Sequence, residues 1–186
     1  GRTFLQSVIR VMKGLEYKVI KHILNSAGIE RFTDYQMDMV RLGIGLYGVS
    51  ASGQKGLRNI STLKTTILQI QNVPAGDSIG YSRMSYVKRD SRIAIIPIGY
   101  ADGLDRHFSN GGGEVVINGH RCPIIGNICM DACMIDVTDI DAREGDTVII
   151  FGEELPVSEL SDKLKTIPYE ILTSISPRVK RVYYRE

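Results

Sequence analysis

Two glycine-containing segments carry the residues best suited to chemistry. Residues 98–103 read Ile-Gly-Tyr-Ala-Asp-Gly and residues 126–131 read Gly-Asn-Ile-Cys-Met-Asp, and each follows an apolar run. Each segment offers a polar or aromatic side chain together with backbone amides. Glycine loses more backbone entropy on folding than any other residue, so such segments are costly unless they are used. We therefore predict that both belong to one functional site, and that this chain carries only part of it.

Composition restricts the class of protein. Of the 186 residues, 43% are hydrophobic and 24% are charged, which is typical of a globular chain with a core. The net charge of +2 gives no reason to expect nucleic acid or an anionic membrane as a partner. No apolar run approaches the roughly 20 residues of a membrane span. The chain begins with Gly1 instead of Met, so we expect a further portion upstream.

The three cysteines indicate a reduced environment. Cys122, Cys129 and Cys133 are odd in number and show no repeated metal-ligand spacing. We expect a cytoplasmic protein without a disulfide framework and without a metal site.

Residues 1–48 alternate between helical and strand patterns. We predict a helix over 4–13, a strand over 17–24, a short helix over 34–39 and a second strand over 40–47. This order is a βαβ unit, which implies a parallel sheet with helices outside it. Two strands do not complete such a sheet.

From residue 63 onward the pattern favours short strands. Asn118-Gly119 is a strong signal for a two-residue hairpin turn. Short strands with this spacing predict a small β-barrel or sandwich. Residues 50–59, rich in Gly, Ser and Lys, are the expected linker. We predict strands over 64–73, 92–97, 114–117, 121–125, 134–136 and 147–151, a helix over 156–164 that starts near Ser158, and a last strand over 178–184.

From residue 21 to its end the chain resembles the C-terminal portion of alanine racemase, a pyridoxal-phosphate (PLP) enzyme. The resemblance rests on the order and spacing of several motifs: Asn25-Ser26-Ala27, residues 39–44 and 46–48, Gly80-Tyr81, residues 98–103 and 126–131, and Ser176 with Arg178-Val179. It implies that residues 1–50 are the last part of a PLP-binding (β/α)8 barrel. Residues 51–186 would then be a C-terminal, β-barrel-like domain.

The resemblance also assigns catalytic roles. Racemisation removes the Cα proton from one face of an amino acid and returns a proton to the other, so it needs two opposed bases. One would be the PLP lysine, and the other would be Tyr81, reaching in from the partner subunit of a homodimer with shared active sites. A phenol is a weak base at neutral pH, so we expect nearby cations to favour its phenolate. Arg41, held by His22 on the preceding strand, would face the pyridine nitrogen of PLP from a buried strand.

Further residues are assigned to binding. Ser26 with the Gly43-Ile44 backbone resembles a phosphate cradle. The Met130 amide resembles a contact to the substrate carboxylate, and Tyr100, Cys129 and Asp131 would lie near the active-site entrance. From local sequence alone, Tyr81 is equally a packed strand tyrosine, Ser26 a turn residue and Cys129 a small buried hydrophobe.

Two departures from the family pattern stand out. Pro177 occupies the place where the family often has a tyrosine that helps to hold the phosphate, and Ser82 follows Tyr81 where a glycine is usual. No lysine here has the context of the PLP lysine, so we expect these residues alone to be inactive. The complete enzyme would make D-alanine for peptidoglycan. The alternatives are a non-catalytic domain for dimerisation or interaction, or a racemase of another amino acid such as serine.

Overall fold

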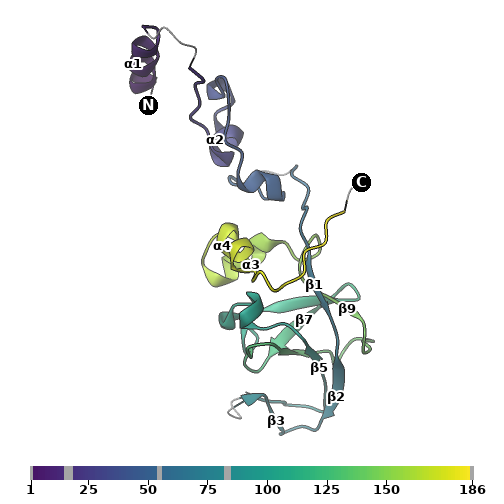
Figure 1. The fold of residues 1–186 in the computed structure, drawn as a ribbon. Helices are drawn as coiled ribbons and strands as arrows, with labels where there is room; N and C mark the ends of the chain where they lie inside the picture. Colours follow the sequence, from purple (N-terminus) through teal and green to yellow (C-terminus); the bar gives the residue numbers. More distant parts are fainter. Residues whose placement is uncertain (1, 15–18, 54–55, 82–84, 185–186) are drawn as a thin grey trace. The chain divides into compact units, whose positions relative to one another are not determined.

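The computed structural model describes residues 2–14, 19–53, 56–81 and 85–184. The chain divides into two compact units, residues 1–57 and residues 58–186 (Figure 1). Each unit is described by itself.

In its described residues, the first unit contains two α-helices and two 3₁₀ turns. Helix α1 spans Arg2–Met12 and helix α2 spans Ser26–Arg31. The 3₁₀ turns span Thr33–Tyr35 and Ile44–Tyr47. Helix α2 begins after Asn25, whose side chain accepts a hydrogen bond from the Gly28 amide at 3.0 Å and so satisfies one of the unpaired N–H groups of the first turn.

Two extended segments of this unit run parallel to each other. The Asp38 amide donates to the Lys21 carbonyl, the Arg41 amide donates to the Leu24 carbonyl, and His22 forms a parallel bridge with Met39. Helix α2 lies between the two segments in the sequence, so the direction of the predicted βαβ unit is confirmed.

Two element predictions in this unit are wrong, whereas the predicted helix over 4–13 is confirmed to within two residues as α1. The helix predicted over 34–39 lies earlier, over 26–31, because the Asn25 cap starts it there. The strand predicted over 40–47 is a 3₁₀ turn from residue 44 that ends at Gly48 in the left-handed region (φ 75°). Of the strand predicted over 17–24, residues 17 and 18 lie outside the described residues, and the described remainder forms only the His22 bridge.

The second unit is built on a seven-stranded antiparallel sheet in the order β1-β9-β6-β7-β8-β5-β2 (Figure 1). The predicted hairpin is confirmed, since Ile117 pairs with His120 across Asn118-Gly119. The strands are β1 (Leu63–Thr66), β2 (Gln69–Val73), β5 (Ser91–Ile96), β6 (Glu114–Ile117), β7 (His120–Ile125), β8 (Cys133–Asp136) and β9 (Thr147–Phe151).

The sheet curls until its two edges are joined by one stretch of chain. Strands β1 and β2 are opposite edges of the sheet, yet only Ile67 and Leu68 separate them. The Ile67 amide donates to the Asp146 carbonyl beside β9, and the Leu68 amide donates to the Ile95 carbonyl of β5. The single strand predicted over 64–73 is therefore wrong, because the chain changes partner at this step. The predicted β-barrel-like architecture is confirmed.

Smaller elements complete the second unit. Strands β3 (Ser78–Ile79) and β4 (Ser85–Tyr86) form a separate antiparallel pair, which the sequence analysis missed. Helix α3 (Val157–Leu164) matches the predicted helix, although its N-cap is Pro156 instead of a residue at Ser158, and it packs beside α4 (Pro168–Ser174), which was also missed.

The strand predicted over 178–184 is wrong, since these residues lie in no strand. The Arg181 guanidinium instead donates to the carbonyls of Ile175, Ser176 and Val179, so the tail satisfies its own backbone acceptors without a strand partner.

The core of the second unit lies inside the curled sheet. Strand β8 alternates buried and less buried positions, and its Cys133 and Ile135 side chains point inward. Side chains from five strands are fully buried there: Ile96, Val115, Ile117, Ile124, Ile135, Val148 and Ile150. Within the described ranges, no helix has the length and apolar character needed to cross a membrane.

Candidate active site

The two segments singled out from the sequence lie against each other in the second unit. The Tyr100 amide donates to the Cys129 carbonyl at 3.0 Å, and the Ala101 amide donates to the Met130 carbonyl at 3.1 Å. Gly99 makes this approach possible, because a Cβ at this position would lie 2.3 Å from the Cys129 oxygen and 2.4 Å from the Met130 oxygen. The two segments therefore contact each other, as a shared site requires, and their joint role in a functional site stays a prediction.

Arg178 links both segments through their aspartates. Its Nε donates to Asp102 Oδ1 at 2.7 Å, and its Nη2 donates to Asp131 Oδ1 at 2.6 Å. Burial acts to raise the pKa of Asp102, but the hydrogen bonds from Arg178 and from the Gly99 amide outweigh it and hold that pKa below its ordinary value. The hydrogen bond that Arg178 donates to Asp102, followed by the one that it donates to Asp131, raises the pKa of Arg178. The sequence analysis recorded Arg178 only as part of a motif and missed this link.

A cavity of about 500 Å³ opens at this junction. It brings together five residues predicted from the sequence, which are Tyr81, Tyr100, Cys129, Met130 and Asp131. Arg106 and Asn127 also line it, and the Arg106 guanidinium lies 6.0 Å from the centre of the Tyr100 ring. Sequence reasoning missed both, although each falls within or just beyond a singled-out segment.

Tyr81 projects from a glycine turn. Gly80 has a φ of 74°, a left-handed conformation that glycine adopts without the penalty paid by other residues. The Tyr81 side chain is 74% exposed, so its ring is not packed in the core, and the interpretation as a packed strand tyrosine does not hold. Residues 82–84, which include the departure at Ser82, lie outside the described residues.

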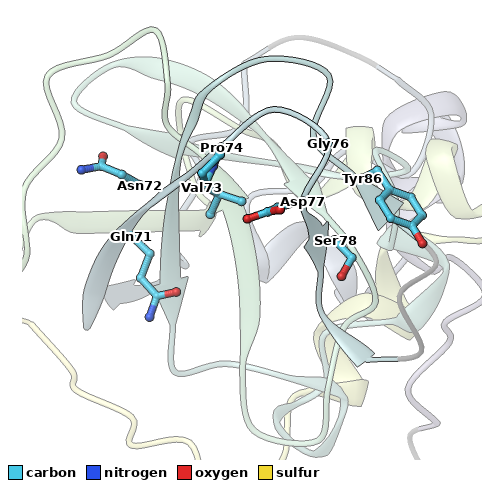
Figure 2. A pocket seen from close by; sticks show the side chains of 8 residues that line it. All are labelled: Gln71, Asn72, Val73, Pro74, Gly76, Asp77, Ser78 and Tyr86. Carbon is cyan, nitrogen blue, oxygen red and sulfur yellow. The ribbon is translucent and has the colours of Figure 1, made fainter.

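A second hollow of about 570 Å³ lies between β2 and the β3-β4 pair. Figure 2 shows Gln71 and Asn72 on one side and Ser78 and Tyr86 on the other. None of the residues predicted to act in a site lines it. We therefore take the cavity around Tyr81 as the candidate active site.

The remaining predicted residues lie in the first unit. Ser26 is 3% exposed, and its Oγ accepts hydrogen bonds from the Gly43 amide at 2.9 Å and the Gly45 amide at 3.4 Å. These two bonds leave the hydroxyl proton of Ser26 for another acceptor. The Ile44 amide opens the 3₁₀ turn and has no partner inside it. One hydroxyl and one amide can thus donate to an anion, whereas the Gly43 amide is already engaged.

Arg41 and His22 are placed differently from the prediction. Arg41 is exposed and lies outside any strand, so its predicted burial on a strand is wrong for this unit. Its Nη2 donates to the Ile23 carbonyl at 3.1 Å, and within the described residues it makes no hydrogen bond to His22. The backbone of His22 forms the parallel bridge instead.

The fold is that of the C-terminal half of PLP-binding racemases. The alanine racemase of Bartonella henselae with covalently bound pyridoxal phosphate superposes with a TM-score of 0.87 at 38% identity, over 98% of this chain and 52% of that one. The alanine racemase of Bacillus anthracis with bound L-Ala-P superposes with a TM-score of 0.89 at 35% identity, over 99% and 50%.

Sequence comparison gives the family. Residues 60–183 match the C-terminal domain of alanine racemase, and residues 2–51 match its N-terminal domain. Alanine racemase 1 of Caldanaerobacter subterraneus subsp. tengcongensis is 44% identical over 174 residues, which cover 89% of this chain and 45% of that protein. This chain belongs to the alanine racemase family, and it spans about half the length of the relatives it matches.

Proposed function

We propose that this chain is the C-terminal half of a PLP-dependent alanine racemase that interconverts L- and D-alanine. The observation that carries the proposal is the cavity at which Tyr81, Tyr100 and Met130 meet, in a chain whose family membership is shown over both units. Relatives of known structure bind pyridoxal phosphate and L-Ala-P. We propose that residues 1–50 are the end of the PLP-binding barrel and that residues 51–186 are the C-terminal β-domain.

The donors of the first unit fit the phosphate of PLP. The Ser26 hydroxyl can donate its proton while two glycine amides hold its oxygen in place. The Ile44 amide supplies a second donor next to it in the chain. Arg41 would face the pyridine nitrogen, where a permanent positive charge disfavours protonation of that nitrogen. His22 lies on the segment beside Arg41 and would help to position it once the remaining barrel strands are present.

Tyr81 would act as one of the two bases. When bound, PLP would supply an electron sink that stabilises the negative charge left on Cα after its proton is removed. The Tyr81 oxygen would accept the proton from one face of Cα or return it there, while a lysine outside these residues serves the other face. Among the described residues that line the cavity, Arg106 carries a positive charge.

Met130, Tyr100, Cys129 and Asp131 would form the substrate side of the cavity. The Met130 amide would donate to the substrate carboxylate, and the Tyr100 ring with Cys129 and Asp131 would restrict access to the site. Tyr81, Tyr100 and Met130 are 74%, 44% and 54% exposed in the single chain. This open surface suits a homodimer in which each subunit contributes Tyr81 to its partner's PLP site. The 186 residues alone are then expected to be inactive.

Replacing Tyr81 by Phe in the full-length enzyme tests the assignment. Loss of a positioned general base lowers turnover by about 10²–10⁴-fold, so Tyr81→Phe should reduce alanine racemisation by that factor while the PLP absorbance remains. Tyr86→Phe is the matched control, because Tyr86 is also exposed but lines the second hollow, and it should keep turnover within about twofold of wild type. Turnover by Tyr81→Phe equal to that of the control would disprove the role of Tyr81.

The same enzyme separates the alternatives. Assays with L-serine beside L-alanine decide between the two substrates, and a full-length protein without PLP absorbance or racemisation would indicate a non-catalytic domain. We propose that the D-alanine product serves peptidoglycan synthesis and that the enzyme acts in the bacterial cytoplasm.

A further inference from the structure

One arginine of the C-terminal tail holds both segments of the candidate active site. Arg178 donates through Nε to Asp102 in one segment and through Nη2 to Asp131 in the other. The two donors are neighbours on one planar guanidinium, so the geometry of the fork fixes the two carboxylates relative to each other. Among the described residues, the backbone hydrogen bonds from the Tyr100 and Ala101 amides also link the two segments directly.

Arg178 lies in the C-terminal tail, residues 175–184, which follows α4. This tail is itself fixed on residues 98–103. The Ser176 amide donates to the Asp102 carbonyl at 3.0 Å, and Gly103 approaches the tail so closely that a Cβ there would lie 2.5 Å from the Ser174 oxygen. Among the described residues, the hydrogen bonds of Arg181 go to carbonyls of the tail. The tail therefore presents Arg178 from a defined place, and Arg181 bonds to the tail itself.

The two aspartates differ in their surroundings. The Asp102 side chain is 14% exposed and also accepts a hydrogen bond from the Gly99 amide, so it belongs to the framework of its segment. The Asp131 side chain is 62% exposed and lines the cavity. Because an exposed ion pair contributes little to stability, we expect the bond to Asp131 to affect the position of the cavity wall more than the stability of the fold.

Removing the guanidinium would leave two like charges close together. Both carboxylates are drawn to one cation, so without it they repel each other, and the repulsion acts directly between the two segments. Asp131 precedes Ala132 and follows Met130, so its displacement would move the Met130 amide as well.

We propose that Arg178 is a positioning residue for substrate binding, which holds the segment of Met130 against the segment of Tyr100 at the cavity. The expected effect on substrate binding rests on the proposed racemase function. The link that Arg178 makes between the two segments rests on the geometry alone.

Hydrogen exchange in the 186-residue chain tests the link without any activity. In Arg178→Met the Tyr100 and Ala101 amides should exchange at least tenfold faster than in wild type, because their acceptors lie on the released segment. Arg178→Lys should behave similarly, since an ammonium cannot reproduce the fork. Arg181→Met is the matched control and should leave both rates within twofold. Unchanged exchange of both amides in Arg178→Met and Arg178→Lys would overturn the proposal.

Kinetics of the full-length holoenzyme test the consequence for the substrate. Arg178→Met should raise the KM for alanine about tenfold and change kcat less than threefold, and Arg178→Lys should do the same, because neither side chain reproduces the fork. A purely structural tail defect would lower kcat and PLP content together, and that result, or an unchanged KM, would refute the positioning role. A full-length wild-type enzyme that does not racemise alanine would refute the proposed function. The hydrogen-exchange rates would still show whether Arg178 holds the two segments together.

Discussion

Gly99→Ala isolates the closest backbone approach at the candidate active site. Gly99 has φ −146° and ψ −165°, an extended conformation that any residue adopts, so alanine causes no backbone strain. Its Cβ, however, would meet the Cys129 and Met130 oxygens at 2.3 and 2.4 Å. Both atoms are backbone, and neither can turn away as the end of a flexible side chain can. The two segments must therefore move apart.

The magnitude follows from the contacts that are lost. Overpacking of a well-packed site costs about 1–3 kcal/mol. The separation also breaks the bonds from the Tyr100 and Ala101 amides to those two carbonyls, at about 0.5–1.5 kcal/mol each. The free energy of unfolding should fall by about 2–6 kcal/mol. With a urea dependence of about 2 kcal/mol per molar, the midpoint of unfolding followed by far-UV circular dichroism should drop by about 1–3 M.

Gly119→Ala provides the comparison, because it has the opposite character. Gly119 sits in the β6-β7 turn with a φ of 77°, and a Cβ there would meet nothing within 4 Å. Its cost is backbone strain alone, about 1–2 kcal/mol, or about 0.5–1 M in urea at the same slope. If the midpoint of Gly99→Ala is no lower than that of Gly119→Ala, the steric reasoning at the cavity is incorrect.

Two further predictions concern titration and thiol reactivity. Asp102→Asn should flatten the loss of stability in acid. Burial acts to raise the pKa of Asp102, but hydrogen bonds from Arg178 and the Gly99 amide hold that pKa below its ordinary value. The ionised Asp102 therefore stabilises the fold above about pH 4, and this contribution is lost as the pH falls through the folded-state pKa. Urea midpoints between pH 5 and pH 2 measure this, and parallel curves for variant and wild type would contradict it. Burial raises the pKa of the Cys133 thiol to about 12, and the neighbouring Cys129 adds a smaller effect in the same direction. At pH 8 Cys133 should therefore react with iodoacetamide at least tenfold more slowly than the partly exposed Cys129. Peptide mass spectrometry gives both rates, and equal labelling would show that the Cys133 environment is not as buried as described.

Features encoded by neighbouring residues could be predicted from the sequence. The β6-β7 hairpin is one, since Asn118 and Gly119 both take a positive φ, and Asn-Gly is the residue pair typical of such a turn. The meeting of residues 98–103 with residues 126–131 is another, because both segments end strands of one sheet and carry glycine where a close approach needs it.

Features that depend on distant partners could not be predicted. Residues 64–73 read as one strand, and only the pairing with different strands on either side shows that the chain changes partner at Ile67 and Leu68. The strand predicted over 40–47 depends on parallel neighbours, and its two glycines, Gly43 and Gly45, favour the observed turn when such neighbours are not among the described residues of this unit. Arg178 lies 76 residues from Asp102 in the sequence, so no local pattern reports their contact.

The cavity owes its shape more to main chain than to side chains, and this decides which positions tolerate change. Cys129 and Met130 hold residues 98–103 through their carbonyl oxygens, so other side chains at these two positions can keep both hydrogen bonds. Gly99 has no such freedom, because any Cβ there collides with the same carbonyls. Arg178 is the exception among the links, since its contribution lies wholly in a side chain whose fork no other residue type reproduces. Substitutions at Gly99 and Arg178 should therefore disturb the wall of the site more than substitutions at Cys129 and Met130, whose side chains line the cavity.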